Sequence, residues 1–137
     1  MRILGIDYGE KRIGVAITDP LNMFAYPLTT LNNDTSLWNQ LQKIFSEYKI
    51  EKAIVGYPLK ESGAPSKISE MVLKFKESLI NKFSVEVNLV DERYSSLIAQ
   101  QRILQSVSSK KKRQDKSLLD KNAAAVLLED YLSKSKY

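Results

Sequence analysis

Four acidic residues stand at positions where strand ends and a helix start could bring them together. Asp7 ends the first strand-like segment, and Asp91 and Glu92 follow the fifth. Asp120 lies in the first turn of the last helix-like segment. Strands that end at one rim of a sheet, and a helix packed on that rim, can place such carboxylates side by side. A carboxylate cluster would bind a hard cation such as Mg²⁺, and two ions about 4 Å apart can activate water for phosphodiester cleavage.

Each of these acids also has a purely structural interpretation. Asp7 could begin an Asp-Tyr-Gly turn, with its side chain bonded to local amides. Asp91 or Glu92 could pair with Arg93, and only one of the two can point at a site because side chains alternate along a strand. Asp120 stands three residues after a serine, which is typical of a capping box. Spacing alone therefore favours a structural role for Asp120.

Cysteine and histidine are both absent from the 137 residues. Without cysteine there are no disulfides, thiolate nucleophiles or Cys-ligated zinc, and this composition fits a reducing cytosol. Without histidine there is no imidazole base, which excludes His-dependent triads, zinc hydrolases and His-based phosphotransfer. Carboxylate, hydroxyl or lysine chemistry remains, as does binding without catalysis.

The charge of the chain favours a polyanionic partner. Lys and Arg number 21 against 16 Asp and Glu, for a formal net charge of +5. Residues 101–121 carry an excess of five positive charges, which equals that of the whole chain. Within this segment lie four consecutive cations, Lys110, Lys111, Lys112 and Arg113. They could hold a nucleic-acid backbone near Asp120, or they could form a solvated loop.

Hydrophobic periodicity predicts an α/β chain whose strands alternate with helices after an initial meander. The expected strands are residues 2–8, 12–18, 24–31, 52–57 and 85–90, and the expected helices are 37–48, 68–79, 95–104 and 117–132, with a basic loop over 106–116. This order predicts a mixed sheet covered by helices, and the length suits a single domain over 1–137. No apolar run approaches the roughly 20 residues of a membrane-spanning helix, and the amino terminus does not resemble a signal peptide.

Four segments, in order along nearly the whole chain, resemble the YqgF family of Holliday junction resolvases or pre-16S rRNA nucleases. They read GIDYGEKRIGVA at 5–16, VGYPL at 55–59, DERYSS at 91–96, and DKNAAA with LLEDYL between 120 and 132. Each motif alone is weak, but the four together are specific. The resemblance implies a ribonuclease H-like fold, with a five-stranded mixed sheet in the order 3-2-1-4-5 flanked by helices.

The resemblance also implies the site. It carries a catalytic role onto Asp7, onto Glu92 in preference to Asp91, and onto Asp120, so that the capping-box interpretation of Asp120 is set aside. Asp7, Glu92 and Asp120 would hold one or two Mg²⁺ or Mn²⁺ ions, with Asp91 as a possible substitute. Phosphates would be bound by basic residues, namely Lys11, Arg12, Arg93 and the run from Lys110 to Arg113.

We therefore expect a cytoplasmic nuclease acting on structured RNA, in maturation of the 16S rRNA 5′ end within ribosomal precursor particles. The protein would be a monomer or weak homodimer with no membrane contact. One alternative is a DNA junction nuclease with the same site, and another is an RNA-binding assembly factor without cleavage. The chain is too short for a third alternative, an actin-like ATPase, because that fold needs two domains.

Overall fold

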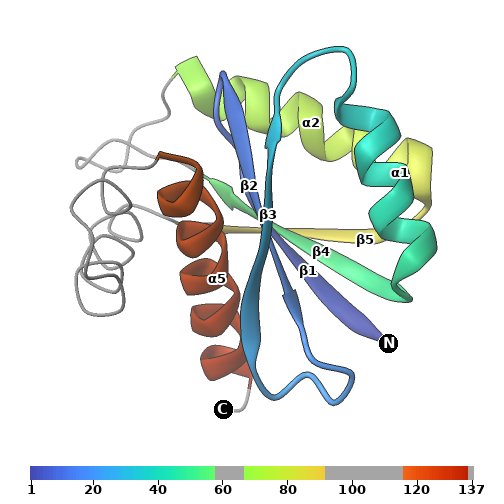
Figure 1. Ribbon diagram of the computed structural model, residues 1–137, viewed down its shortest axis with the longest axis vertical. Helices are drawn as coiled ribbons and strands as arrows, with labels where there is room; N and C mark the ends of the chain where they lie inside the picture. Colours follow the sequence, from blue (N-terminus) through green and yellow to red (C-terminus); the bar gives the residue numbers. More distant parts are fainter. Residues whose placement is uncertain (58–66, 92–115, 136–137) are drawn as a thin grey trace.

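The computed structural model describes residues 1–57, 67–91 and 116–135 (Figure 1). Its elements are β1 (Arg2–Asp7), β2 (Arg12–Thr18), β3 (Ala25–Asn32), α1 (Leu37–Glu47), β4 (Ile50–Tyr57), α2 (Lys67–Phe83), β5 (Glu86–Asp91) and α5 (Lys116–Ser135). The helix expected over 95–104 and residues 106–115 of the expected basic loop lie outside the described residues. Lys116, which was assigned to that loop, begins α5 instead.

The five strands form one sheet in the order β3-β2-β1-β4-β5, which confirms the predicted order. The first three strands pair antiparallel, whereas β1 with β4 and β4 with β5 pair parallel. Strand β4 begins two residues earlier than predicted because Ile50 pairs with Arg2 of β1. Hydrogen bonding between distant strands therefore decides this boundary.

Helices cover both faces of the sheet, with α5 on one face and α1 and α2 on the other (Figure 1). Side chains alternate along β1, so that Leu4 and Ile6 join the core under α1 and α2 while Ile3 packs with α5. Trp38 packs against the α1–α2 core. Among the described helices, none combines the length and hydropathy that a membrane-spanning segment requires.

Helix α2 is longer than the predicted segment at both ends. Its last residue, Phe83, stacks on Phe45 of α1 with ring centroids 4.2 Å apart, so packing between the helices stabilises the added turn. The helix ends where Ser84 adopts a φ of 53°, the left-handed conformation that commonly terminates helices.

Close approach of α5 to the sheet depends on small residues. A Cβ atom added to Gly5 of β1 would lie 3.0 Å from the Cβ of Leu128 and 3.1 Å from the carbonyl oxygen of Ala124. Ala123, Ala124 and Ala125 are all buried. Small side chains in both elements therefore let the helix backbone lie directly over β1 and β2.

Candidate active site

Asp7 and Asp120 lie on the same face of the sheet, at the same end. Asp7 stands opposite Gly14 in the antiparallel register of β1 and β2, and opposite residues in such a pair share a face. A Cβ atom added to Gly14 would lie 2.0 Å from the backbone carbonyl oxygen of Asp120. The face that carries Asp7 is therefore the face against which the first turns of α5 pack. Both aspartates are half-buried.

Arg12 holds the carboxylate of Asp120. Its Nε donates a hydrogen bond to Oδ2 of Asp120 at 2.9 Å, and the two side chains are 34% and 23% exposed. We expected Arg12 to bind phosphate, whereas in the structure it orients an acidic side chain 108 residues away. A guanidinium has five N–H donors, so a bond through Nε leaves the Nη groups for a second acceptor.

This ion pair should contribute modestly to stability. Because both side chains are partly exposed, a double-mutant cycle of Arg12→Gln and Asp120→Asn should give a coupling energy of about 0.5–1 kcal/mol. The coupling is measured by urea unfolding at low and high salt, and should shrink with added salt as the charges are screened. A coupling of zero at low salt would mean that the pair does not form in solution.

The turn between β1 and β2 is tied to the end of β3. Nδ2 of Asn33 donates to the carbonyl oxygen of Gly9, and the backbone N–H of Asn33 donates to that of Lys11, both at 2.9 Å. The turn itself is tight, because a Cβ atom on Gly9 would lie 2.4 Å from the carbonyl oxygen of Arg12. These bonds fix Lys11, which is exposed, beside the end of the strand that carries Asp7.

Sequence reasoning did not single out Asn33 or Gly14 as site residues. Asn33 directly follows β3, a position where asparagine is common. Its hydrogen bond to Gly9, 24 residues earlier in the sequence, leaves no trace in the neighbouring residues. Gly14 was noticed only as part of a motif. A glycine within a strand can mark a close backbone approach, and that signal could have identified its contact with α5.

The remaining predicted site residues are only partly covered by the structure. In β5, Val90 packs with the α5 cluster and the backbone of Asp91 stands opposite Tyr57 of β4. Glu92, Arg93 and the cations from Lys110 to Arg113 lie outside the described residues. Among the residues that are described, no three carboxylate-bearing side chains come together as a metal site.

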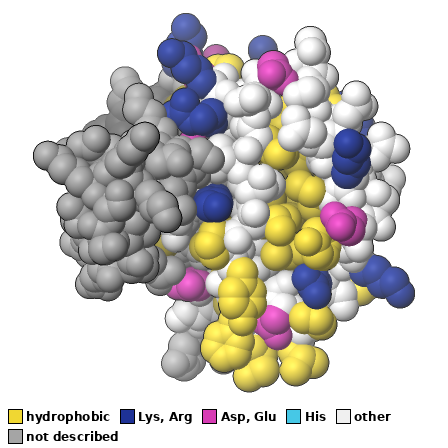
Figure 2. Space-filling model, in the orientation of Figure 1, with side chains coloured by type: hydrophobic (Ala, Val, Ile, Leu, Met, Phe, Trp, Pro, Cys, Tyr) yellow, Lys and Arg dark blue, Asp and Glu magenta, His cyan; other side chains and the backbone are white. Residues whose placement is uncertain are grey.

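The surface has two contrasting ends (Figure 2). Basic side chains gather at the upper end of the view, where the β1–β2 turn lies in Figure 1. Hydrophobic side chains gather at the lower end, where the exposed large apolar residues include Leu21, Met23, Phe24 and Tyr26. Further basic side chains lie along the right and lower right of the view, so the contrast between the two ends is chiefly one of exposed apolar surface.

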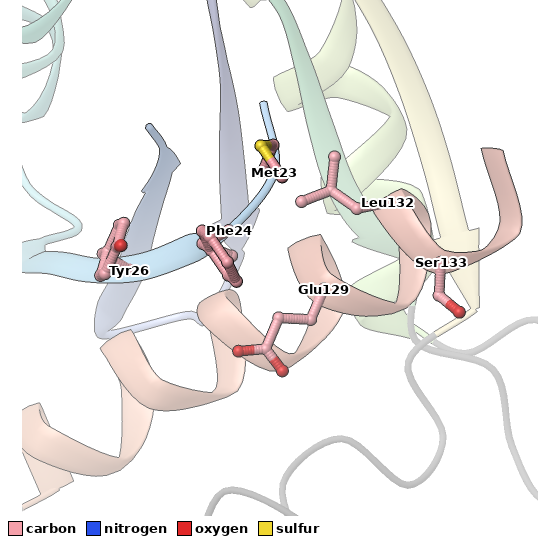
Figure 3. Close-up of a pocket in the computed structure, with 7 residues that line it drawn as sticks. Met23, Phe24, Tyr26, Glu129, Leu132 and Ser133 are labelled. Atoms are coloured by element: carbon pink, nitrogen blue, oxygen red, sulfur yellow. The ribbon is translucent and has the colours of Figure 1, made fainter. Parts of the chain in front are cut away.

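A hollow of about 400 Å³ lies at the apolar end, between β3 and the last turns of α5 (Figure 3). Tyr26 of β3 lines it on one side, with Phe24 just before that strand, and Glu129 and Leu132 of α5 line it on the other. Leu132 lies twelve residues after Asp120, which is about 18 Å along a helix. This hollow is therefore separate from the carboxylates.

Comparison with known proteins identifies the family. The sequence model of the RuvX protein family, which is described as Holliday junction resolvase, matches residues 1–134. Two relatives named "Putative pre-16S rRNA nuclease" are each 40% identical to this chain. The one from Flavobacterium psychrophilum aligns over 134 residues, 97% of either chain, and the one from Flavobacterium johnsoniae over 137 residues, 99% of either chain.

Solved structures share the fold. The fowlpox virus resolvase in complex with Holliday junction DNA superposes with a TM-score of 0.59 at 17% identity, over 100% of both chains. Thermus thermophilus RuvC in complex with its Holliday junction substrate gives a TM-score of 0.58 at 13% identity, over 98% of this chain and 96% of RuvC. The predicted ribonuclease H-like fold is thereby confirmed. With its family model matched over residues 1–134, this chain belongs to the RuvX (YqgF) family, the family that its four motifs resemble.

Proposed function

We propose that this protein is a metal-dependent nuclease that hydrolyses phosphodiester bonds in structured RNA, in processing of the 5′ end of pre-16S rRNA in the cytoplasm. The observation that carries the proposal is the placement of Asp7 and Asp120 on one sheet face at one end. The RNA substrate is supported by the name that the 40% identical relatives bear.

The residues at this end suit Mg²⁺ or Mn²⁺. Asp7 and Asp120 offer carboxylate oxygens, the ligands that hard cations prefer, and no histidine or cysteine is present to favour zinc. We propose Glu92 as the third ligand. Glu92 follows Asp91, the last residue of β5, and it is the residue of this acidic pair that the family resemblance favours. One or two bound ions would supply a hydroxide nucleophile at neutral pH and stabilise charge on the leaving oxygen.

The basic residues near the carboxylates would bind the nucleic-acid backbone. Lys11 is exposed on the β1–β2 turn, so its ammonium group can reach and neutralise a phosphate. Arg12 can bind a phosphate through Nη while Nε keeps the carboxylate of Asp120 in place. Arg93 and the run from Lys110 to Arg113 are proposed as further phosphate ligands on the basis of charge alone.

The proposal is tested by digesting an RNA precursor that spans the 16S 5′ end beside a four-way DNA junction. We expect cleavage of the RNA with Mg²⁺ or Mn²⁺, and none after chelation, because the proposed mechanism takes its nucleophile from water activated by the metal. Gel analysis of end-labelled products measures cleavage of each substrate with metal and after chelation. Activity that survives thorough chelation would refute the metal mechanism.

A second candidate function is cleavage of branched DNA. The family description and the fold shared with two resolvases favour it. Cleavage of the junction with the RNA left intact would establish this alternative. A third candidate, an RNA-binding assembly factor, predicts normal RNA binding with no turnover under any metal condition.

The run of four cations should contribute to binding rather than to the chemical step. Changing Lys110, Lys111, Lys112 and Arg113 together to Ala should lower the salt slope of log affinity by up to ~4, since each phosphate contact contributes about one. The turnover rate at saturating substrate should change far less, because no metal ligand is altered. Filter binding over a salt series measures the slope. A slope equal to that of the parent protein would show that these residues do not contact the backbone.

A further inference from the structure

A second cavity, of about 350 Å³, opens between α1 and α2 on the sheet face opposite α5. It is lined by aromatic and polar side chains, which include Tyr8, Asn33, Trp38, Lys74, Phe75 and Ser78. Its volume lies in the range of sites that hold small organic groups. Among the described residues, none of those proposed to bind metal or phosphate lines this cavity.

Three aromatic rings form one wall. The ring of Phe75 is buried, at 5% exposed, and supports the other two. The Tyr8 ring lies 4.9 Å from it, and the Trp38 ring stacks on it at 5.4 Å. Tyr8 and Trp38 are only partly buried, so they present aromatic surface to the cavity. Rings held in this way offer a rigid stacking platform for a planar group.

Polar and cationic groups border the same cavity. Lys74 is exposed on α2, while Ser78 and Asn33 are half-buried and carry a hydroxyl and an amide. Lys82 lies outside the lining, with its Nζ 5.1 Å from the centre of the Trp38 ring. A planar ligand with hydrogen-bonding edges and an attached anion matches this combination. Nucleotides have this chemistry.

The cavity is adjacent to the carboxylates. Tyr8 directly follows Asp7, so their Cα atoms are about 3.8 Å apart across one peptide bond. Asn33, which also lines the cavity, donates to the carbonyl oxygen of Gly9 in the turn beyond Tyr8. Figure 1 places this turn at the same end of the molecule as the first turns of α2 and α5. A strand lying over the end of β1 could thus reach both faces.

We propose that this cavity binds an unpaired nucleobase of the nucleic-acid substrate, next to the phosphodiester that would be cleaved at the proposed metal site of Asp7 and Asp120. The inference rests on the proposed nuclease function and specifies its substrate: cleavage occurs beside a nucleotide that is not base-paired. A base within a duplex is stacked on its neighbours and cannot enter such a cavity, whereas loop and end nucleotides can.

The single tryptophan of the chain makes the proposal directly measurable. Trp38 fluorescence is recorded in the absence of metal, while three probes are titrated separately. The probes are a short single-stranded oligoribonucleotide, the same sugar-phosphate chain without bases, and a mixture of nucleoside monophosphates. We expect quenching by the oligonucleotide only. Equal quenching by the abasic chain would refute base recognition, and equal quenching by the monophosphates would indicate a free nucleotide as the ligand.

A variant that fills the cavity provides the second measurement. Ser78→Leu should weaken binding of the oligonucleotide about tenfold, because the larger side chain would occupy the space proposed for the base. Binding of the abasic chain should be unchanged, because that chain has no base to insert. The matched control is Ser46→Leu, the same change at an exposed position of α1. Fluorescence anisotropy measures affinity, and thermal unfolding confirms that both variants fold.

The outcomes separate this proposal from the proposed nuclease function. If Ser78→Leu binds the oligonucleotide as tightly as the parent protein, the cavity is a packing gap and the proposal is wrong, even where the parent protein cleaves RNA. If the parent protein shows base-dependent quenching but cleaves neither RNA nor DNA with metal, the cavity binds bases and the nuclease function is wrong.

Discussion

Asp7→Asn should lower the rate of phosphodiester cleavage by about a thousandfold or more, a loss of roughly 4 kcal/mol in transition-state stabilisation. The substitution removes the negative charge of a proposed metal ligand and keeps the shape of the side chain. Asp7 ends β1 and is only half-buried, so the sheet pairing of its backbone with Gly14 should persist. Cleavage of the RNA precursor under saturating Mg²⁺ measures the effect.

The matched control for this prediction is Glu51→Gln. Glu51 is exposed near the start of β4, so the change removes the same charge from the opposite end of the parallel strands. The control should cleave RNA at the rate of the parent protein. An unchanged rate in Asp7→Asn would refute the catalytic assignment of Asp7, and equal losses in both variants would indicate a general effect of net charge.

Gly14→Ala should destabilise the protein by more than about 3 kcal/mol, the upper end of what overpacking of a well-packed core usually costs. The added methyl group would lie 2.0 Å from the backbone carbonyl oxygen of Asp120, which is not a flexible side-chain atom that could move away. The start of α5 must therefore shift away from β2. Since Asp120 moves with it, cleavage should also fall steeply. Urea unfolding and the cleavage assay measure the two effects.

Gly5→Ala is the graded control for Gly14→Ala. It introduces the same methyl group under the same helix, but the nearest atom is a side-chain carbon at 3.0 Å. The carbonyl oxygen of Ala124 follows at 3.1 Å, and a displacement of a few tenths of an ångström relieves both contacts, so the loss of stability should be smaller and Asp120 should stay in place. Equal stabilities for the two variants would mean that α5 does not lie against Gly14 in solution.

Much of the fold could be predicted from local pattern, because hydrophobic periodicity reflects which face of each element is buried. The apolar run within residues 2–8 predicted β1, and the helical spacing of Leu37 and Leu41 predicted α1. Four motifs in sequence order predicted the family and, through it, the order of the five strands. Strand boundaries were less predictable, since Ile50 extends β4 only through its pairing with Arg2.

The arrangement of the candidate site depended on contacts between distant segments. The position of Asp120 at a helix start allowed a place in a carboxylate cluster, but its local spacing favoured a capping role, and the motif resemblance decided for chemistry. Its carboxylate is bound by Arg12, 108 residues away in sequence, and its backbone lies against Gly14. The ion pair of Arg12 with Asp120 was not predicted for the same reason. Local sequence determines which side chains turn inward, whereas the docking of α5 on β2 determines which of them meet, because that packing involves residues that no periodic pattern connects.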